Sequence, residues 1–140
     1  MERSLVLIKP DAVSRNLVGK IIGRIEEKGM SLLALRMLHM DRSLAERHYA
    51  VHADKPFFND LVAYITSEPI VAAVFGGENA VEVIRQVMGA TDPAKAAPGT
   101  IRKDFAQDIE RNSVHGSDAP ETAKHEIALF FTEKEIFGQW

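Results

Sequence analysis

The sequence predicts an α/β fold in which short buried strands alternate with amphipathic helices. Three observations lead to this expectation. The 140 residues are 46% hydrophobic and 26% charged, a composition typical of one globular domain, which we take to span 1–140. Apolar runs of strand length are bounded by Pro or Gly. Between these runs, apolar residues recur at helical spacing.

The first elements form a strand, helix, strand series. Residues 4–9 make a short apolar run, and Pro10 disfavours helical angles in the residue before it, so we expect a strand there. Residues 19–28 place their isoleucines on one helical face, and Gly29 supplies a stop. Residues 31–40 show no clear alternation. Their position between two helices favours a strand.

Two helices are expected next. Ser43 followed by Glu46 is a capping-box pattern, which predicts a helix start. Asp54 with Pro56 suggests a second start, before the apolar positions of residues 57–65. The chain should therefore form two helices in succession before it returns to the sheet.

A third strand and its helix follow. The β-rich run 70–75 predicts a strand, and Gly76 with Gly77 is expected to break it. Asn79 is a candidate cap for a helix that Gly89 would end.

The C-terminal third begins with an irregular stretch. Residues 90–111 contain two prolines and little periodicity, and we interpret them as a binding loop, because loops of this length usually have a functional reason. Order is expected to return at 113–116. Asp118 and Glu121 then make a capping pattern before a helix. Its inner side would carry Ala123, Ile127 and Phe130.

Composition narrows the possible chemistry. The net charge of −3 gives no general attraction for nucleic acid or anionic lipid, so we expect neither as a partner. The apolar runs are far shorter than the roughly 20 residues that cross a bilayer, and the N-terminal run is too short for a secretory signal. A cytoplasmic location is therefore expected. The absence of cysteine excludes disulfides, thiolate metal sites and cysteine nucleophiles.

The most informative segment reads Asn112-x-x-His115-Gly-Ser-Asp118. It places a histidine between an expected strand and an expected helix. Gly116 permits close backbone approach, and the free amide groups at the start of a helix favour a nearby anion. This histidine is thus set to meet a phosphate. The other histidines lack this setting, and each alone is expected to be a surface or structural residue: His39, His48, His52 and His125.

This segment resembles the active-site signature of the nucleoside diphosphate kinases. The resemblance covers nearly the whole chain. Further motifs of that family follow in order: Lys9-Pro-Asp11, His48-Tyr49, Lys55-Pro-Phe-Phe58, Gly89-Ala-Thr-Asp-Pro93 and Pro98-Gly-Thr-Ile-Arg102. Several separated motifs in the right order make coincidence implausible.

The resemblance implies a ping-pong reaction. His115 would take the γ-phosphate of a nucleoside triphosphate such as ATP and return it to a nucleoside diphosphate. Imidazole has an ordinary pKa of about 6.5, so it can be a nucleophile near neutral pH without a strong base. By resemblance, Glu126 accepts a hydrogen bond from the ring nitrogen that does not attack. Ser117 would in turn hold Glu126.

The resemblance also assigns phosphate-binding residues. Arg85 and Arg102 would neutralise the charge spread over the moving group, which phosphoryl transfer requires. Arginine suits this role because its planar fork holds two oxygens at once. Thr91 would donate a hydroxyl hydrogen bond, and Tyr49 would hydrogen-bond near the transferred phosphate.

Sugar and base contacts follow from the same resemblance. Lys9 and Asn112 are similar to the pair that grips the sugar hydroxyls. Phe57 and Ile109 would enclose the base in an apolar slot with little base selectivity. No carboxylate cluster in the sequence offers a dedicated metal site, so Mg²⁺ is expected to arrive bound to the nucleotide phosphates.

The element order and the resemblance together imply a ferredoxin-like sandwich, a four-stranded antiparallel sheet with helices on one face. The resemblance further implies a homo-oligomer. We favour a hexamer over a tetramer, because Pro93 and Pro98 resemble residues at the hexamer's subunit contacts.

Four positions depart from the family pattern, none at an expected catalytic residue: Glu68, Gly76, Lys103 and Ala119. Glu68 puts the local turn in doubt, since non-glycine residues tolerate left-handed angles poorly. For Lys103 we favour a solvent-facing side chain.

Two other classes of protein remain open. A non-catalytic nucleotide-binding or regulatory module of the same fold would tolerate loss of His115. A histidine phosphocarrier protein would be labelled by a partner protein without a free nucleotide donor. The expected nucleotide-gripping set argues against the second class: Lys9, Phe57, Arg85, Arg102 and Asn112.

Overall fold

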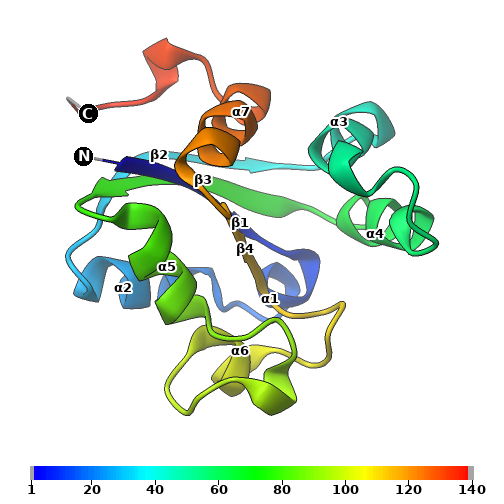
Figure 1. Ribbon diagram of the computed structural model, residues 1–140, viewed down its shortest axis with the longest axis horizontal. Coiled ribbons are helices and arrows are strands. Elements are labelled where there is room, and N and C mark those ends of the chain that lie inside the picture. The colour runs from blue at the N-terminus through cyan, green and yellow to red at the C-terminus, as the bar shows by residue number, and fades with distance from the viewer. Residues whose placement is uncertain (1, 139–140) are drawn as a thin grey trace.

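A computed structural model describes residues 2–138 of the chain. Its centre is a four-stranded sheet in the order β2-β3-β1-β4, in which every neighbouring pair is antiparallel (Figure 1). This confirms the expected four-stranded antiparallel sheet. The strands are β1 (Glu2–Ile8), β2 (Ser31–Leu38), β3 (Ile70–Gly77) and β4 (Val114–Gly116).

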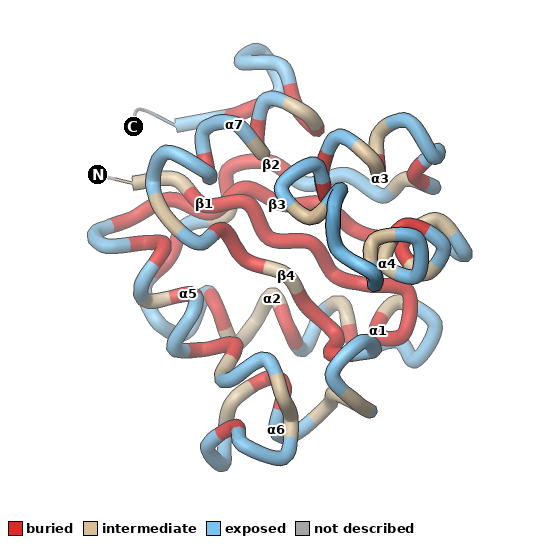
Figure 2. The backbone as a smooth tube through the Cα atoms, turned by 45° about the vertical axis from the view of Figure 1, so that its right-hand side comes forward, coloured by how far each residue is buried: buried red, intermediate tan, exposed pale blue. Residues whose placement is uncertain are grey.

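Helices cover both faces of this sheet, and the expectation of one covered face was wrong. The reason lies in the central strand β1, where Leu5 and Leu7 pack into one core cluster while Val6 and Ile8 pack into another. Successive side chains of a strand point to opposite faces, so a continuous apolar run needs cover on both. Figure 2 shows the resulting buried strands between two outer layers.

One layer packs against the face that carries Leu5 and Leu7. It contains α3 (Arg42–His48), α4 (Phe58–Ile65) and α7 (Pro120–Phe130), with the short turns η1 (Ala50–His52) and η3 (Glu133–Glu135). The α7 residues that were expected to face inward are all buried: Ala123, Ile127 and Phe130.

The other layer packs against the face that carries Val6 and Ile8. It contains α1 (Pro10–Ser14), α2 (Val18–Glu27), α5 (Ala80–Met88) and α6 (Ile101–Phe105), with the turn η2 (Pro93–Lys95) beside α6. No helix between residues 2 and 138 is long and apolar enough to cross a membrane.

The pair of glycines after the third apolar run does not end the strand. Gly76 and Gly77 continue β3 and pair with the first residues of β1. A Cβ at Gly77 would lie 2.8 Å from the side chain of Met30, so the glycine permits a close approach there. The expected strand break was therefore wrong, and Gly77 serves instead to make room for the side chain of Met30.

The helix caps also differ from the expected ones. Asp41, and not Ser43, caps α3 by accepting a hydrogen bond from the backbone N–H of Leu44 at 2.8 Å. Asn79 occupies the cap position of α5 in a left-handed conformation with a φ of 52°, but its side chain makes no capping bond.

The start of α7 uses Ala119 and Thr122 in place of the expected Asp118 and Glu121. The Thr122 hydroxyl accepts a hydrogen bond from the Ala119 N–H at 2.9 Å. Asp118 is thereby free to pair with Arg85 on α5.

The segment 90–111, which we expected to be a loop, contains α6 and η2. Thr100 begins α6 by accepting a hydrogen bond from the Lys103 N–H at 3.3 Å. Arg24 on α2 holds the helix through an ion pair with Asp104 at 2.7 Å and by stacking on Phe105. A helix of five residues spans little more than one turn, which is too short to show periodicity in sequence.

The departures from the family pattern fit this fold. Within residues 2–138 the non-glycine residues with positive φ are Asn16, Asn79 and Ser113, so the turn at Glu68 needs no left-handed angle. Lys103 is exposed, as favoured above.

Candidate active site

The centre of the candidate site is a histidine and carboxylate pair. Nε2 of His115, on β4, lies 2.9 Å from Oε2 of Glu126 on α7. The other carboxylate oxygen of Glu126 accepts a hydrogen bond from the hydroxyl of Ser117 at 2.8 Å. Burial would raise the pKa of Glu126, but these two hydrogen bonds and the nearby histidines outweigh it and lower that pKa. Glu126 is therefore an ionised acceptor at neutral pH.

The backbone around His115 is firmly placed. His115 pairs with Leu7 of the buried strand β1, and Ser117 exchanges hydrogen bonds of 3.1 Å with Leu5 of the same strand. Gly116 between them packs against α5, where an added Cβ would lie 2.7 Å from the Met88 sulfur. The glycine thus permits close strand and helix packing beside the His115 ring.

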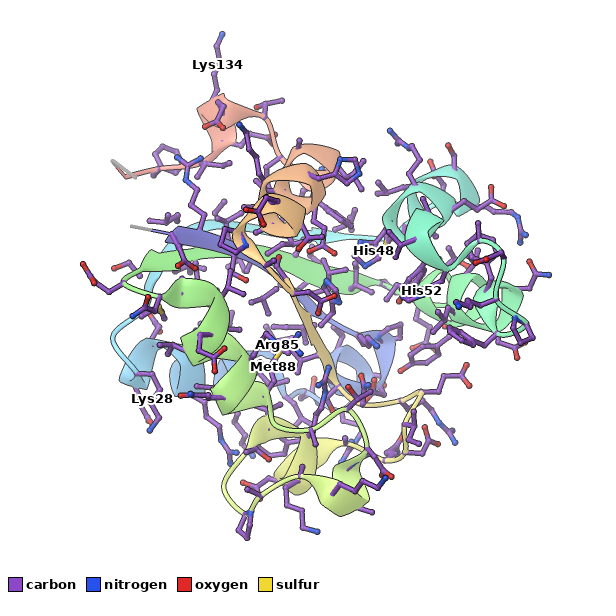
Figure 3. All side chains as sticks on the ribbon, viewed as in Figure 1. Lys28, His48, His52, Arg85, Met88 and Lys134 are labelled. Carbon is purple, nitrogen blue, oxygen red and sulfur yellow. The ribbon has the colours of Figure 1, made fainter. Side chains whose placement is uncertain are left out.

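His48 is the residue that sequence reasoning missed. Its ring, on α3 (labelled in Figure 3), meets the ring of His115 edge to face at a centroid distance of 4.8 Å. The side chain is 1% exposed, and neither ring nitrogen has a hydrogen-bond partner within the described chain. Burial, and next the proximity of His115, lower the pKa of His48 to about 3. It is therefore a neutral imidazole at physiological pH.

Tyr49 lies one residue further along. It is buried, and its ring contacts that of His48 at a centroid distance of 4.7 Å. Burial raises the pKa of Tyr49, with Glu126 contributing, so its hydroxyl remains a neutral donor. The His48-Tyr49 motif thus places two contacting rings in the layer that also carries Glu126.

The expected sugar-binding pair is in direct contact. Nζ of Lys9 donates a hydrogen bond of 3.0 Å to Oδ1 of Asn112, and both residues are buried. Burial, and next the charge of Arg102, lower the pKa of Lys9 to about 8. The Asn112 amide also donates to the carbonyl of Ile109 at 2.9 Å.

The two expected phosphate-binding arginines come from the opposite layer. Arg102 is buried and donates to the carbonyls of Gly89 at 3.0 Å and Val114 at 2.8 Å, while its Nε has no partner within residues 2–138. Burial, and next the charge of Arg85, lower the pKa of Arg102 to about 10. Arg85 itself is exposed and pairs with Asp118 at 2.6 Å.

The expected base-binding residues are open to solvent. Phe57 is 44% exposed and Ile109 is 59% exposed. Phe57 precedes α4 and lies near the ring of His52 at a centroid distance of 5.5 Å. Thr91, the remaining expected residue, is exposed in the segment after Gly89.

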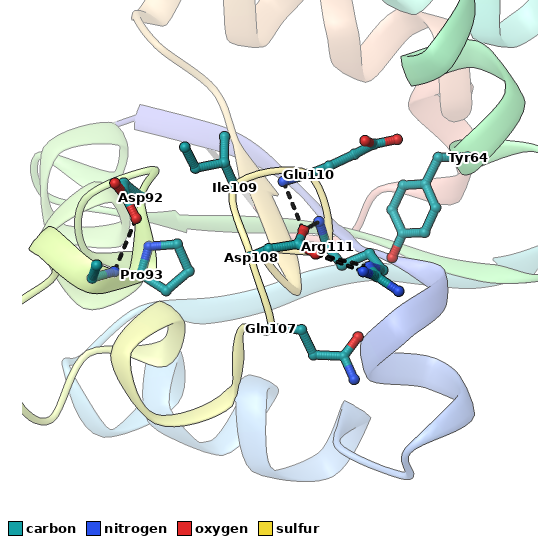
Figure 4. Close-up of a pocket in the computed structure, with 9 residues that line it drawn as sticks. Tyr64, Asp92, Pro93, Gln107, Asp108, Ile109, Glu110 and Arg111 are labelled. Atoms are coloured by element: carbon teal, nitrogen blue, oxygen red, sulfur yellow. Dashed lines mark hydrogen bonds and ion pairs between the residues drawn. The ribbon is translucent and has the colours of Figure 1, made fainter.

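A cavity of about 750 Å³ is lined by Ile109, by neighbouring residues of its turn and by Tyr64 of α4 (Figure 4). Its lining includes Asp92, Asp108 and Glu110, which would repel phosphate, so we do not take it as the phosphate site. The turn beside it is closed by Asp108, whose carboxylate accepts hydrogen bonds from Arg111 at 2.7 to 3.0 Å. This turn holds Ile109 at the rim.

A second network of hydrogen bonds, which no sequence signal predicted, lies beside the contact between Lys9 and Asn112. One oxygen of Asp11 accepts a hydrogen bond from the Tyr64 hydroxyl at 2.5 Å, and the other accepts from Ser113 at 3.0 Å. Asp11 follows Lys9 by two residues and Ser113 adjoins Asn112. The network therefore ties α1 and α4 to the start of β4.

Within residues 2–138, His48, His115 and Glu126 are the one grouping of three side chains of the kind that binds metals. Their nearest ligand atoms all lie within 4.8 Å of one another.

A histidine held by a carboxylate on an edge strand, with two arginines nearby, places this α/β sandwich among the phosphotransferases. The family model described as nucleoside diphosphate kinase matches residues 2–136. The chain belongs to the nucleoside diphosphate kinase family.

Similar proteins carry the same description. The nucleoside diphosphate kinase of Dehalococcoides mccartyi is 62% identical over 136 residues, which cover 97% of this chain and 96% of that protein. That of Archaeoglobus fulgidus is 57% identical over 97% of this chain and 90% of its own length. The activity is accordingly the transfer of a terminal phosphate from a nucleoside triphosphate to a nucleoside diphosphate.

Solved structures agree with the fold. The Aquifex aeolicus nucleoside diphosphate kinase has a TM-score of 0.95 at 40% identity, covering 97% of this chain and 99% of that one. The Halobacterium salinarum enzyme, solved in complex with CDP, has a TM-score of 0.95 at 46% identity, covering 99% and 92%.

Proposed function

We propose that this chain transfers the phosphoryl group through a covalent phosphohistidine on His115. The hydrogen bond between Nε2 of His115 and the ionised Glu126 carries this proposal. An ionised carboxylate only accepts hydrogen bonds, so Nε2 must carry the ring proton. Nδ1 of the neutral ring is then left with its lone pair, which makes it the nucleophile.

The first half-reaction follows from this tautomer. Nδ1 attacks the γ-phosphorus, and the bond from that phosphorus to the bridging oxygen breaks. The nucleoside diphosphate leaves with the electron pair. The ring now carries a proton on Nε2 and the phosphoryl group on Nδ1, and Glu126 stabilises its positive charge. A second nucleoside diphosphate reverses these steps and takes the group away.

The cationic residues and hydroxyl donors would bind the phosphates. Arg102 approaches from the layer opposite Glu126, and its unpartnered Nε supports contact with an anion. Arg85 lies near enough to Arg102 to lower its pKa, and a phosphate would compete with Asp118 for Arg85. Thr91 and Tyr49 complete the proposed set as neutral donors. Such positioning and neutralisation supply most of the catalysis in phosphoryl transfer.

The sugar of the nucleoside would bind to Lys9 and Asn112, and its base would bind to the exposed pair Phe57 and Ile109. Lys9 and Asn112 already form one hydrogen-bonded unit, so a sugar hydroxyl can meet both at once. Phe57 and Ile109 offer flat, exposed apolar contact to any base. The Halobacterium salinarum relative, solved with CDP, supports a nucleotide ligand of this kind.

Magnesium is part of the proposed substrate. Mg²⁺ prefers oxygen ligands and commonly binds through substrate phosphates. The histidine-rich grouping at His115 offers it one carboxylate and two nitrogens, so we expect it to arrive with the nucleotide. We also infer that residues 1–140 act as one catalytic domain, in which one sheet carries both layers. The cytoplasm, with its nucleotide pool, is the proposed location.

Oligomerisation is supported by strand β2. This strand ends the sheet, and its side chains Leu35 and Met37 are 52% and 63% exposed. An exposed apolar edge strand is a template for pairing with a second copy. Pro98, exposed near η2, supports further contacts, and we favour a hexamer of such dimers over a tetramer.

The test uses ATP labelled at the γ position. The protein should become labelled, the label should be labile to acid, and added diphosphate should release it. His115→Ala should remove both labelling and turnover, whereas His125→Ala, a matched change at an exposed histidine of α7, should keep both. Normal turnover in a folded His115→Ala protein would refute the proposed nucleophile.

The same experiment separates the other two classes of protein. Labelling that needs a partner protein in place of free nucleotide would indicate a phosphocarrier. Nucleotide binding without any labelling would indicate a non-catalytic module.

A further inference from the structure

We propose that His48, His115 and Glu126 form an inhibitory binding site for a divalent transition metal such as Zn²⁺, separate from the magnesium that the nucleotide carries. The site would lie directly behind the reactive ring. Metal bound there would occupy the nitrogen of His115 that now faces Glu126.

The separation of the three ligand atoms fits a small cation. Nε2 of His115 lies 2.9 Å from Oε2 of Glu126, and Nδ1 of His48 lies 3.8 Å from the same oxygen. All three ligand atoms lie within 4.8 Å of one another. A cation equidistant from these three atoms would be at most about 2.4 Å from each, whereas zinc bonds to nitrogen and oxygen measure about 2.0 to 2.2 Å. Side-chain shifts of a few tenths of an ångström would close this gap.

The donor set selects the metal class. Two imidazoles and one carboxylate are a known zinc ligand set that leaves a fourth position for water. Imidazole also suits Co²⁺, Ni²⁺ and Cu²⁺, while Mg²⁺ prefers oxygen alone. The site should therefore discriminate against the magnesium that accompanies the nucleotide.

Two of the three ligands, His48 and Glu126, already hold the protonation states that metals need, whereas Nε2 of His115 must first lose its proton. His48 is a buried neutral imidazole, and both of its nitrogens are without partners in the described chain. A buried unpartnered polar atom is unfavourable, so a metal bond to one of these nitrogens removes that penalty. Ser117 donates to the second oxygen of Glu126 at 2.8 Å, the kind of support that orients metal-binding carboxylates.

Access to the site is through His115. Its side chain is 23% exposed, compared with 13% for Glu126 and 1% for His48. A cation would enter past the reactive ring, and the fourth position can face the same opening.

Metal binding would silence the nucleophile by changing its tautomer. A metal takes the lone pair of Nε2, so the ring proton must leave that atom. The neutral ring then carries its proton on Nδ1, where no lone pair remains for attack on phosphorus. This inhibitory step rests on the proposed role of His115, whereas metal binding itself does not.

The first test measures Zn²⁺ binding to the full chain without nucleotide or magnesium, by competition with a chromophoric chelator. The wild-type protein should bind one Zn²⁺ per chain. His48→Gln should weaken binding at least tenfold, and His125→Gln, a matched change at an exposed residue beside Glu126, should not. Equal binding by both variants, or no stoichiometric binding by the wild type, would overturn the site.

A second measurement needs no variant and covers the case in which His48→Gln does not fold. Nitrogen-15 NMR of labelled histidines should show His115 protonated on Nε2 in the metal-free protein and on Nδ1 after zinc loading. An unchanged His115 spectrum at full zinc occupancy would refute the tautomer change.

A third measurement tests inhibition. Zinc-loaded wild-type protein, freed of excess metal and mixed with labelled magnesium ATP, should be phosphorylated at least tenfold more slowly, with recovery on chelation. Unchanged labelling of zinc-loaded protein would overturn the inhibition alone. Absence of labelling in metal-free protein would refute the proposed function and leave the metal site to the binding data.

Discussion

His115 on β4 and Glu126 on α7 are joined by a 2.9 Å contact between Nε2 and Oε2, and the second oxygen of Glu126 is held by Ser117. Glu126 thus cannot rotate away from the ring without losing a second hydrogen bond. The pair fixes the tautomer and the direction of the imidazole before any nucleotide binds.

Replacing Glu126 by glutamine should reduce the rate of phosphorylation of His115. The amide keeps the shape but removes the charge that stabilises the phosphorylated, protonated ring. Loss of a charged hydrogen bond costs about 1.5 to 3 kcal/mol, so a decrease of about 10-fold to 150-fold is expected. Single-turnover labelling measures it, with Glu121→Gln at an exposed position of α7 as control. A Glu126→Gln rate within twofold of the wild type would refute this role.

The specificity constant kcat/KM for ATP should decline as pH rises through about 8. Burial lowers the pKa of Lys9 to about 8, so its ammonium group is charged below that pH and neutral above it. Neutral Lys9 loses its charge-assisted bond to the sugar, and kcat/KM reports groups of the free enzyme. Lys9→Arg keeps the charge, so its profile should stay flat over this range. A wild-type profile that is flat to pH 9.5 would contradict the assignment.

Nucleotides with all common bases should react within modest factors of one another. The exposed pair Phe57 and Ile109 contacts the base through apolar surface, so a changed ring substituent leaves no buried polar group unpaired. Nucleotides that lack the 3′-hydroxyl should be slower by about tenfold to a few hundredfold, because Lys9 and Asn112 lose a shared partner. Rate constants for ATP, GTP, CTP, dATP and a 2′,3′-dideoxy analogue test both statements. A preference of thousands for one base, or equal rates for dATP and the dideoxy compound, would contradict them.

His48 should make folding sensitive to acid. Its pKa is 6.5 in the ordinary state and about 3 in the folded chain, so between these values the unfolded chain binds one more proton. The contribution of neutral, buried His48 to the free energy of unfolding is therefore complete above pH 6.5 and is lost as pH falls toward 3. The unfolding free energy should therefore fall with pH by up to about 1.4 kcal/mol per unit more steeply in the wild type than in His48→Gln. Urea unfolding between pH 6 and 4 measures both slopes, with His125→Gln expected to follow the wild type. Parallel slopes would show that His48 does not titrate in this way.

Charges on β2 should dissociate the oligomer. Leu35→Glu combined with Met37→Glu places like charges along the proposed pairing edge, where two copies would repel each other. Sedimentation should show a smaller species than the wild type at equal concentration. Val51→Glu, at another highly exposed apolar position, serves as the control and should leave the assembly unchanged. If the β2 variant keeps the wild-type size, subunits must meet elsewhere.

The succession of strands and of most helices along the chain could be predicted, because local sequence patterns determine where each element forms. Apolar runs placed β1 and β3, the position of residues 31–40 between two helices placed β2, and the helical spacing of residues 19–28 agrees with α2 at Val18–Glu27. The cap of α3 was misjudged because Ser43 and Asp41 are both good cap residues, and in the structure the carboxylate of Asp41 accepts the hydrogen bond from Leu44. The short helix α6 carried too little periodicity to be detected.

The candidate site also contains residues that local motifs could predict and residues that only tertiary packing brings together. Residues within motifs, such as Lys9 and Asn112, could be paired by resemblance, and the structure brings them into contact. His48 could not be placed beside His115 because the two are far apart in sequence and only the packing of α3 on α7 joins them. Coverage of both sheet faces was missed although the continuous apolar run of β1 indicates it, because that run was used to place the strand and not to count its covered faces.

His115 lies on β4, a strand of the sheet that separates two helical layers, each with its own core cluster. Glu126, which is hydrogen-bonded to the His115 ring, and the neighbouring His48 belong to the layer of α3 and α7, whereas Arg85 and Arg102 belong to the layer of α5 and α6. A core substitution in one layer should therefore shift the site residues of that layer and leave those of the other layer in place. On the proposed mechanism, substitutions in the first layer should mainly change the reactivity of the His115 ring, and substitutions in the second should mainly change the binding of phosphate.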